Sequence, residues 1–171
     1  TAKLAGSSSD DASISTALVT GIKNYTYTGK AIKQDLNVEV NGKQLSKDKD
    51  YTVSYKNNVN AGTAEVTITG SGSYSGSVSK TFKIAKAKQK IQIKKSYYKK
   101  TAGSKSFKLS GIKGIGKLSY KSSNTKAASV NANGKVTING AGTAKITITA
   151  EGNKNYKKAS AIIKIKVVKK K

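Results

Sequence analysis

A nine-residue segment that occurs twice restricts the fold of this chain more than any other feature of its sequence. The first copy covers residues 61–69 (AGTAEVTIT) and the second covers residues 141–149 (AGTAKITIT), 80 positions later. In both copies a glycine-containing turn opens a stretch in which apolar residues alternate with threonine or a charged residue, which predicts a half-buried β-strand. A turn with a tyrosine follows each copy, Tyr74 in one and Tyr156 in the other. The chain is therefore predicted to be a tandem repeat with a hairpin core in each half.

Alternating segments and turn signals fill the rest of each half. Asn41-Gly42 and Asn133-Gly134 both follow alternating residues, and Asn-Gly is the strongest short-range hairpin signal. Residues 128–130 are expected to pair across the second of these turns with residues 136–138. Residues 163–167 alternate apolar side chains with lysine, which predicts a closing strand with its lysines outside. About seven short strands per half, at intervals near ten residues, indicate an antiparallel sandwich.

These patterns divide the chain into three parts. Residues 1–14 are small and polar and predict a flexible N-terminal segment or anchor, followed by sandwich domains at 15–86 and 87–171. Residues 85–88 are too short for a loose linker, so a nearly continuous strand is expected there. The chain has no cysteine, and the stability of both domains must therefore come from packing. The predicted fold class is all-β, with two tandem antiparallel β-sandwich domains.

Charge is distributed unevenly between the halves. Residues 1–86 hold eleven lysines against seven acidic residues, or +4, whereas residues 87–171 hold twenty-two lysines against the single Glu151, or +21. Such a field attracts polyanions in a salt-dependent way. The chain has no arginine, the residue best suited to base-edge and bidentate phosphate recognition, so no specific nucleic-acid partner is predicted. A lysine-rich surface that only solubilises the chain, or protects sheet edges, is the alternative interpretation.

Catalytic and metal chemistry finds little support. Histidine and cysteine are both absent, which removes the common nucleophile and general-base arrangements. Asp48 and Asp50 flank a turn, where a Ca²⁺ site competes with a solvated turn that Asp50 caps. Glu151, with Asn153 and Asn155 nearby, would be needed for a Lys–Asn isopeptide bond, and a polar hairpin loop is the alternative. We predict no enzyme activity, no catalytic residue, no cofactor and no metal ligand.

Tyrosines are the best candidates for ligand contacts. Tyr97 and Tyr98 combine apolar area with surrounding positive charge, and a wedge at a domain interface is the alternative. Tyr74 and Tyr156 follow turns in which they could stack on sugar rings or fold back to close the end of the core. The candidate ligand-contact residues are Tyr97, Tyr98, Lys94, Lys95, Lys99, Lys100, Tyr74 and Tyr156.

Residues 118–137 (LSYKSSNTKAASVNANGKVT), followed by 141–144 (AGTA), resemble the bacterial Ig-like domains of group 2 found in invasin- and intimin-type adhesins. The resemblance covers about residues 87–168. Residues 27–32, 50–55 and 72–76 are similar to Ig-like or fibronectin-like repeats of large Gram-positive surface proteins, although Gln34 stands where proline is common. The resemblance implies secreted Ig-like sandwich modules that act as spacers, stalks or adhesive decorations without shared catalytic residues.

The expected function is that of a non-catalytic structural and adhesive module on a bacterial surface. Its expected partners are an acidic polysaccharide or cell-wall glycopolymer, or other surface or virion subunits. A phage decoration or fibre protein is the alternative. No run approaches the ~18 apolar residues of a membrane span. Self-assembly through residues 1–15, added to the sheet edge of a neighbouring copy, is a further hypothesis.

Overall fold

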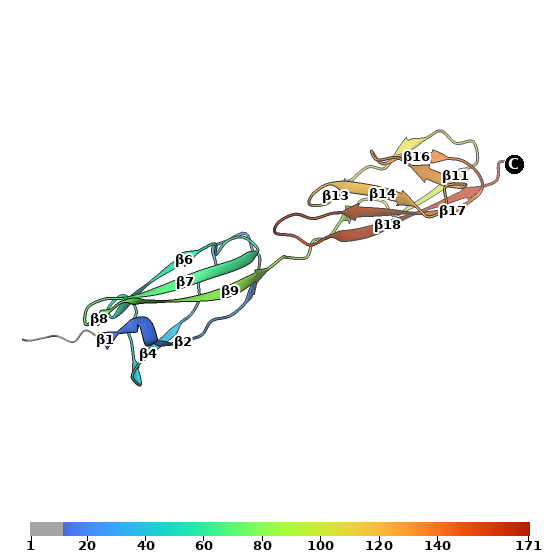
Figure 1. Ribbon diagram of the computed structural model, residues 1–171. Coiled ribbons are helices and arrows are strands. Elements are labelled where there is room, and N and C mark those ends of the chain that lie inside the picture. The colour runs from blue at the N-terminus through green and yellow to red at the C-terminus, as the bar shows by residue number, and fades with distance from the viewer. Residues whose placement is uncertain (1–11) are drawn as a thin grey trace, which may run out of the picture. The chain divides into compact units, whose positions relative to one another are not determined.

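The structure of the protein is a computed structural model that describes residues 12–171 and divides into two compact units (Figure 1). The first unit ends at Ala85, and the second unit is Lys86–Lys171. Every described regular element is a β-strand, apart from the short 3₁₀ turn η1 (Ile14–Thr16). The all-β prediction is therefore confirmed. Among the described residues no helix has the length and apolar character needed to cross a membrane.

The first unit contains two sheets and one additional strand pair. The four-stranded sheet has the order β3 (Tyr25–Thr26), β9 (Ser77–Ala85), β7 (Gly62–Gly70), β6 (Tyr51–Lys56). The three-stranded sheet has the order β2 (Leu18–Thr20), β4 (Asn37–Val40), β5 (Lys43–Gln44). The remaining pair joins β1 (Ala12–Ser13) to β8 (Tyr74–Ser75).

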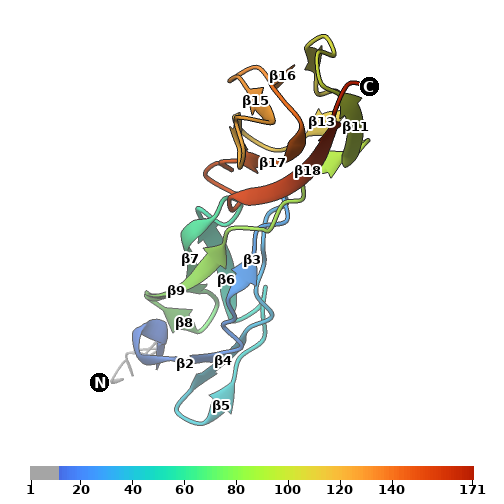
Figure 2. The ribbon, with the colours of Figure 1, turned by 90° about the vertical axis from the view of Figure 1, so that its right-hand side faces the viewer.

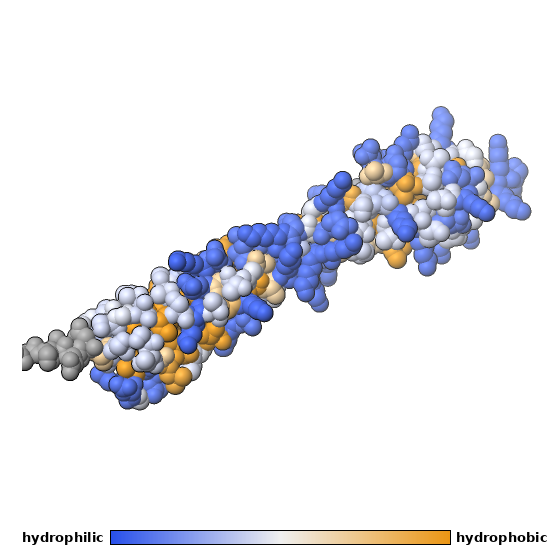
Figure 3. Space-filling model, viewed as in Figure 1, coloured by the Kyte–Doolittle hydropathy of each residue, from blue (hydrophilic) through white to orange (hydrophobic). Residues whose placement is uncertain are grey.

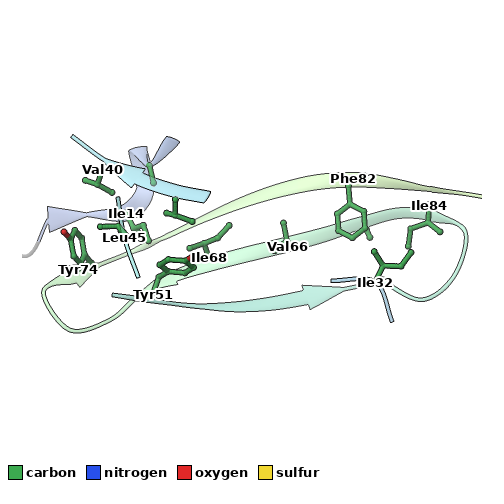
Figure 4. Close-up of a cluster of buried hydrophobic side chains, with 13 residues drawn as sticks. Ile14, Ile32, Val40, Leu45, Tyr51, Val66, Ile68, Tyr74, Phe82 and Ile84 are labelled. Carbon is green, nitrogen blue, oxygen red and sulfur yellow. The ribbon is translucent and has the colours of Figure 1, made fainter. Parts of the chain in front are cut away.

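Alternation along these strands builds the core of the first unit (Figure 4). Val66 and Ile68 of β7 and Phe82 of β9 lie in one cluster with Val38 of the three-stranded sheet. Tyr51 lies in the same cluster, and its burial, followed by the nearby Asp48 carboxylate, raises the pKa of its hydroxyl group. The core thus fills the space between the two sheets, as expected for a sandwich.

The second unit repeats this plan. Its four-stranded sheet has the order β11 (Tyr97–Thr101), β18 (Ala159–Val168), β17 (Gly142–Ala150), β14 (Leu118–Ser122). Its three-stranded sheet has the order β12 (Phe107–Lys108), β16 (Lys135–Ile138), β15 (Ala128–Val130). The additional pair joins β10 (Gln92–Ile93) to β13 (Ile112–Lys113). Ile146 and Ile163 of the larger sheet pack in one cluster with Val136 of the smaller one.

The four-stranded sheets of the two units correspond strand by strand, but the chain enters them differently. Figure 2 shows β15 and β16 on one side of the second unit and β17 and β18 on the other. In the first unit the repeated strand β7 follows β6, its neighbour in the same sheet. In the second unit the repeated strand β17 follows β16, which belongs to the other sheet, while its sheet neighbour β14 precedes the whole β15–β16 hairpin. The sequence repeat therefore marks equivalent sheet positions and not an equivalent chain path.

The predicted hairpins are confirmed. Val40 pairs with Lys43 around Asn41 and Gly42, whose φ angles of 50° and 79° are those that an Asn-Gly turn requires. In the second unit β15 pairs with β16 in the predicted register, with Ala128 opposite Ile138.

Three expectations differ from the structure. The sheets are not purely antiparallel, because β1–β8, β3–β9 and β11–β18 are parallel pairs. No continuous strand crosses residues 85–88, because β9 ends at Ala85 and Ala87 forms an isolated bridge with Tyr156. The segment predicted at 1–14 as a flexible segment or anchor is not flexible where it is described: Ala12–Ser13 is a strand and Ile14 is fully buried. Residues 1–11 lie outside the described residues, as does most of the segment in the self-assembly hypothesis.

Candidate functional site

Strand β11 places its two tyrosines on opposite faces of the sheet. It runs parallel to β18 with Tyr97 opposite Lys164 and Tyr98 opposite Ile165. Consecutive strand residues point to opposite faces, so Tyr97 is 43% exposed while Tyr98 packs against the core. The two rings therefore do not form the single contact patch that the sequence predicted, and Tyr97 alone is presented to solvent on the outer face.

Two of the candidate lysines contact aromatic rings of their own unit. The rings of Tyr98 and Phe107 lie 5.0 Å apart between centroids. Lys95 Nζ lies 4.9 Å from the Tyr98 centroid, and Lys100 Nζ lies 4.6 Å from that of Phe107. Cation–π contacts at such partly exposed positions contribute about 0.5–1 kcal/mol each. Lys95 and Lys100 thus stabilise the packing of these two rings, while Lys99 points to the outer face.

Tyr74 and Tyr156 are not equivalent ligand contacts. Tyr74 is 9% exposed and belongs to the core of the first unit, where it closes one end (Figure 4). That burial removes it from the candidate contacts, since a sugar ring could not reach its face. Tyr156 is half-buried, bridges Ala87 through its backbone and donates its N–H to Asn153 Oδ1 at 3.0 Å.

The acidic candidates have structural roles. Asp50 Oδ2 accepts a hydrogen bond from the Ser46 backbone N–H at 2.8 Å, which confirms the capping role. Glu151 lies 3.3 Å from Lys158 Nζ in an exposed ion pair. No group of acidic side chains suited to a metal ion occurs within residues 12–171. No charged side chain there is buried, so no described lysine has the burial that an isopeptide bond needs.

A shallow cleft that sequence reasoning missed follows the β10–β13 pair. A hollow of about 400 Å³ is lined by Gln92, Ile93, Lys94, Gly111 and Lys113. A second hollow of about 260 Å³ shares Gln92 and Lys113 with it. Lys94, one of the candidate lysines, thus lies at this cleft and apart from the β11 lysines. Lys94 packs closely on Gly111, because a Cβ at Gly111 would lie 2.6 Å from Lys94 Cβ.

The outer face of the second unit's larger sheet collects lysines from all four strands. Lys99 lies opposite Lys166, and Lys164 lies between Tyr97 and Lys145. We call this the lysine face; its lysines are Lys99, Lys121, Lys145, Lys164 and Lys166. On the side of the second unit visible in Figure 3, hydrophilic residues surround small hydrophobic areas. The sequence predicted that Lys164 and Lys166 point outward, but it gave no sign that β11 brings Lys99 and Tyr97 beside them.

The sequence of the second unit matches a known family over part of its length. Residues 103–152 match the family model described as "Intimin, immunoglobulin-like domain". The match begins after β11 and ends after β17, and it confirms the resemblance to intimin-type Ig-like domains for that segment. No curated protein matches the chain.

Several solved structures resemble the chain at low identity. Domains 4 and 5 of the S-layer protein SbsC align at 18% identity and a TM-score of 0.38, covering 92% of this chain and 100% of that one. Drosophila N-cadherin EC1-4 aligns at 13% identity and a TM-score of 0.39, covering 86% of this chain and 48% of that one. A SusE-like surface-located polysaccharide-binding protein from the Bacteroides thetaiotaomicron heparin utilisation locus aligns at 13% identity and a TM-score of 0.34, with coverages of 88% and 34%.

Proposed function

We propose that the chain is a non-catalytic structural and adhesive module of an extracellular bacterial surface protein, and that its second unit contacts acidic glycopolymers. The family match over residues 103–152 supports the first part, because it links the second unit to an Ig-like domain described for intimin. The sandwich itself supports only a scaffold role, since such folds carry many functions.

Unbalanced charge is the observation that carries the second part. Residues 87–171 have twenty-two lysines and one acidic residue, and that residue, Glu151, is already paired with Lys158. Nearly all positive charge of the second unit is therefore free of acidic partners within residues 12–171. A field of this kind raises the local concentration of polyanions and favours their association.

Binding of the full chain to acidic polysaccharide tests this function. We expect the chain to bind polygalacturonate, and the affinity to fall steeply as the salt concentration rises, because counterions compete with the lysines. Neutral dextran is the control polymer. Absence of binding at low salt, or equal binding to dextran, would contradict the acidic-glycopolymer function.

Location distinguishes the surface module from its alternative. Immunogold electron microscopy of the producing organism, with an antibody to residues 87–171, is expected to label cell walls or surface filaments. Labelling of phage heads or tails would instead support the decoration or fibre protein.

A further inference from the structure

Strand register places the lysines of the lysine face in regular rows. One row across the sheet is Lys99, Lys166 and Thr143, and the next is Tyr97, Lys164 and Lys145. Neighbouring strands lie about 4.8 Å apart, and alternate residues along a strand about 6.7 Å apart. Four ammonium groups therefore gather over two adjacent rows, with no acidic side chain on any strand of this sheet.

Protection of the sheet edges does not account for the lysine face. Lysines often guard exposed sheet edges against pairing with another chain. The edge strands here are β11 and β14, which carry Lys99 and Lys121, whereas Lys145, Lys164 and Lys166 lie on the two central strands. Like charges directly opposite each other also destabilise a sheet, so this arrangement has a cost that solubility alone would not require.

The equivalent sheet of the first unit has an outer face without these rows of lysines. Glu65 occupies the position of Lys145 in the repeated strand and lies opposite Lys56 and Thr81. Threonine and serine fill most of the neighbouring outer positions, and Thr67 and Ser79 share a hydrogen bond of 2.8 Å. The fold therefore accepts an ordinary mixed outer face, and the lysine face is a property of the second unit.

Exposed apolar side chains lie among the lysines of the lysine face. Tyr97 is 43% exposed and Ile162 is 54% exposed, and both lie on this face. Ile162 is two residues from Lys164, the residue opposite Tyr97, so the two side chains are diagonal neighbours. An aromatic ring and an aliphatic group beside cations suit a ligand that has both apolar ring faces and negative groups.

We propose that the lysine face binds an extended acidic polysaccharide, which rests on the proposed glycopolymer function. Its carboxylate or sulfate groups pair with Lys99, Lys164 and Lys166, and a sugar ring lies against Tyr97. The flexible lysine stems let each ammonium group follow the spacing of the polymer.

The face suits a polysaccharide better than other polyanions. Single-stranded nucleic acid is held by several stacking aromatic residues, and this face offers only Tyr97. The absence of arginine also removes the preferred bidentate phosphate ligand. An anionic membrane is bound by an apolar face that enters the headgroup region, whereas here two apolar side chains lie among five lysines.

Two matched double variants of the full chain test the position of the site. The first is Lys99→Gln with Lys166→Gln, a directly opposed pair on the lysine face. The control is Lys108→Gln with Lys135→Gln, a directly opposed pair on the other sheet of the same unit. Each variant removes two charges, so the long-range field changes equally. Affinity for polygalacturonate is measured by titration calorimetry at several salt concentrations.

We expect the first variant to lose about tenfold in affinity and the control less than about threefold. The slope of log affinity against log salt should also fall, by up to about one per lysine that contacts an anionic group. Tyr97→Ala should weaken binding several-fold with an unchanged salt slope. Equal losses in the two double variants would overturn the lysine face while leaving the glycopolymer function standing. No binding by the unaltered chain would overturn both, and tighter binding of single-stranded DNA or phosphatidylglycerol vesicles at this face would overturn the polysaccharide assignment.

Discussion

The repeated strands of the two units bury the same positions, and they differ in charge at one position that faces solvent. Ala64, Val66 and Ile68 are buried in β7, and Ala144, Ile146 and Ile148 are buried at the equivalent positions of β17. The outward position between the first two is Glu65 in one unit and Lys145 in the other. Packing between two sheets thus restricts the inner positions of the strand to apolar residues, while the charge at an outer position can change without altering the sheet.

The largest expected effect comes from the shared inner positions. Ile146→Ala removes a fully buried side chain, and such changes lower the free energy of unfolding by about 2–5 kcal/mol. We expect the loss of hydrogen-exchange protection to be confined to the second unit, because each unit has its own core. Lys145→Ala, one residue away and exposed, should change stability by less than about 0.5 kcal/mol. Equal loss of protection in both units would show that they unfold together.

A smaller effect is expected where the copies diverge. Gly70 is equivalent to Ala150, but a Cβ at Gly70 would lie 2.8 Å from the Tyr74 backbone, because β8 turns back against the strand. Gly70→Ala should therefore destabilise the first unit by about 1–3 kcal/mol through overpacking.

The reverse substitution is its control. Ala150→Gly should cost the second unit only about 0.5–1 kcal/mol, the usual effect of glycine within a strand. Hydrogen exchange in β7 and in β17 measures both. If Gly70→Ala left the protection of β7 unchanged, the close approach of β8 would not restrict this position.

Each unit has a glutamine whose side chain forms hydrogen bonds to the backbone of a segment distant in sequence. Gln89 Oε1 accepts from the Ile115 N–H at 2.7 Å, and Nε2 donates to the Ile115 carbonyl oxygen at 3.1 Å. Gln34 makes the same pair of bonds to Lys23, at 3.1 and 2.9 Å, in a more exposed place.

We expect Gln89→Ala to cost about 1–3 kcal/mol, because it leaves partly buried backbone groups without partners, and Gln34→Ala to cost about 1 kcal/mol or less. Chemical denaturation, with hydrogen exchange to assign the unit, measures the difference. A larger loss for Gln34→Ala would contradict the ranking by burial.

Local patterns predicted the elements of the fold well. The alternation of Ile163, Ile165 and Val167 identified the inner face of β18, and all three are buried. Alternation does not encode strand direction, however, so the parallel β11–β18 pair could not be read from it. The residues before Ile14 are small and polar, so the sequence pattern likewise did not predict that Ile14 belongs to the core.

The candidate site was predicted only in part. Tyr97 and Lys99 were chosen because they are adjacent in sequence to other tyrosines and lysines, yet strand geometry turns Tyr98 and Lys100 to the other face. Their actual neighbours, Lys164 and Lys166, lie more than sixty residues away in sequence and are brought there by the register of β18. A contact of that kind depends on strand order, which the sequence pattern does not specify.

Exchanging Glu65 and Lys145, the equivalent outward residues that differ between the copies, is the most direct test of the lysine face. It shows whether this face, rather than total charge, binds acidic polysaccharide. The double variant Glu65→Lys with Lys145→Glu keeps the formal net charge at +25. Hydrogen exchange checks that both units remain folded. We predict that the affinity for polygalacturonate falls about tenfold, because a carboxylate now lies opposite Lys164. Unchanged affinity would contradict the lysine face and leave net charge as the cause of binding.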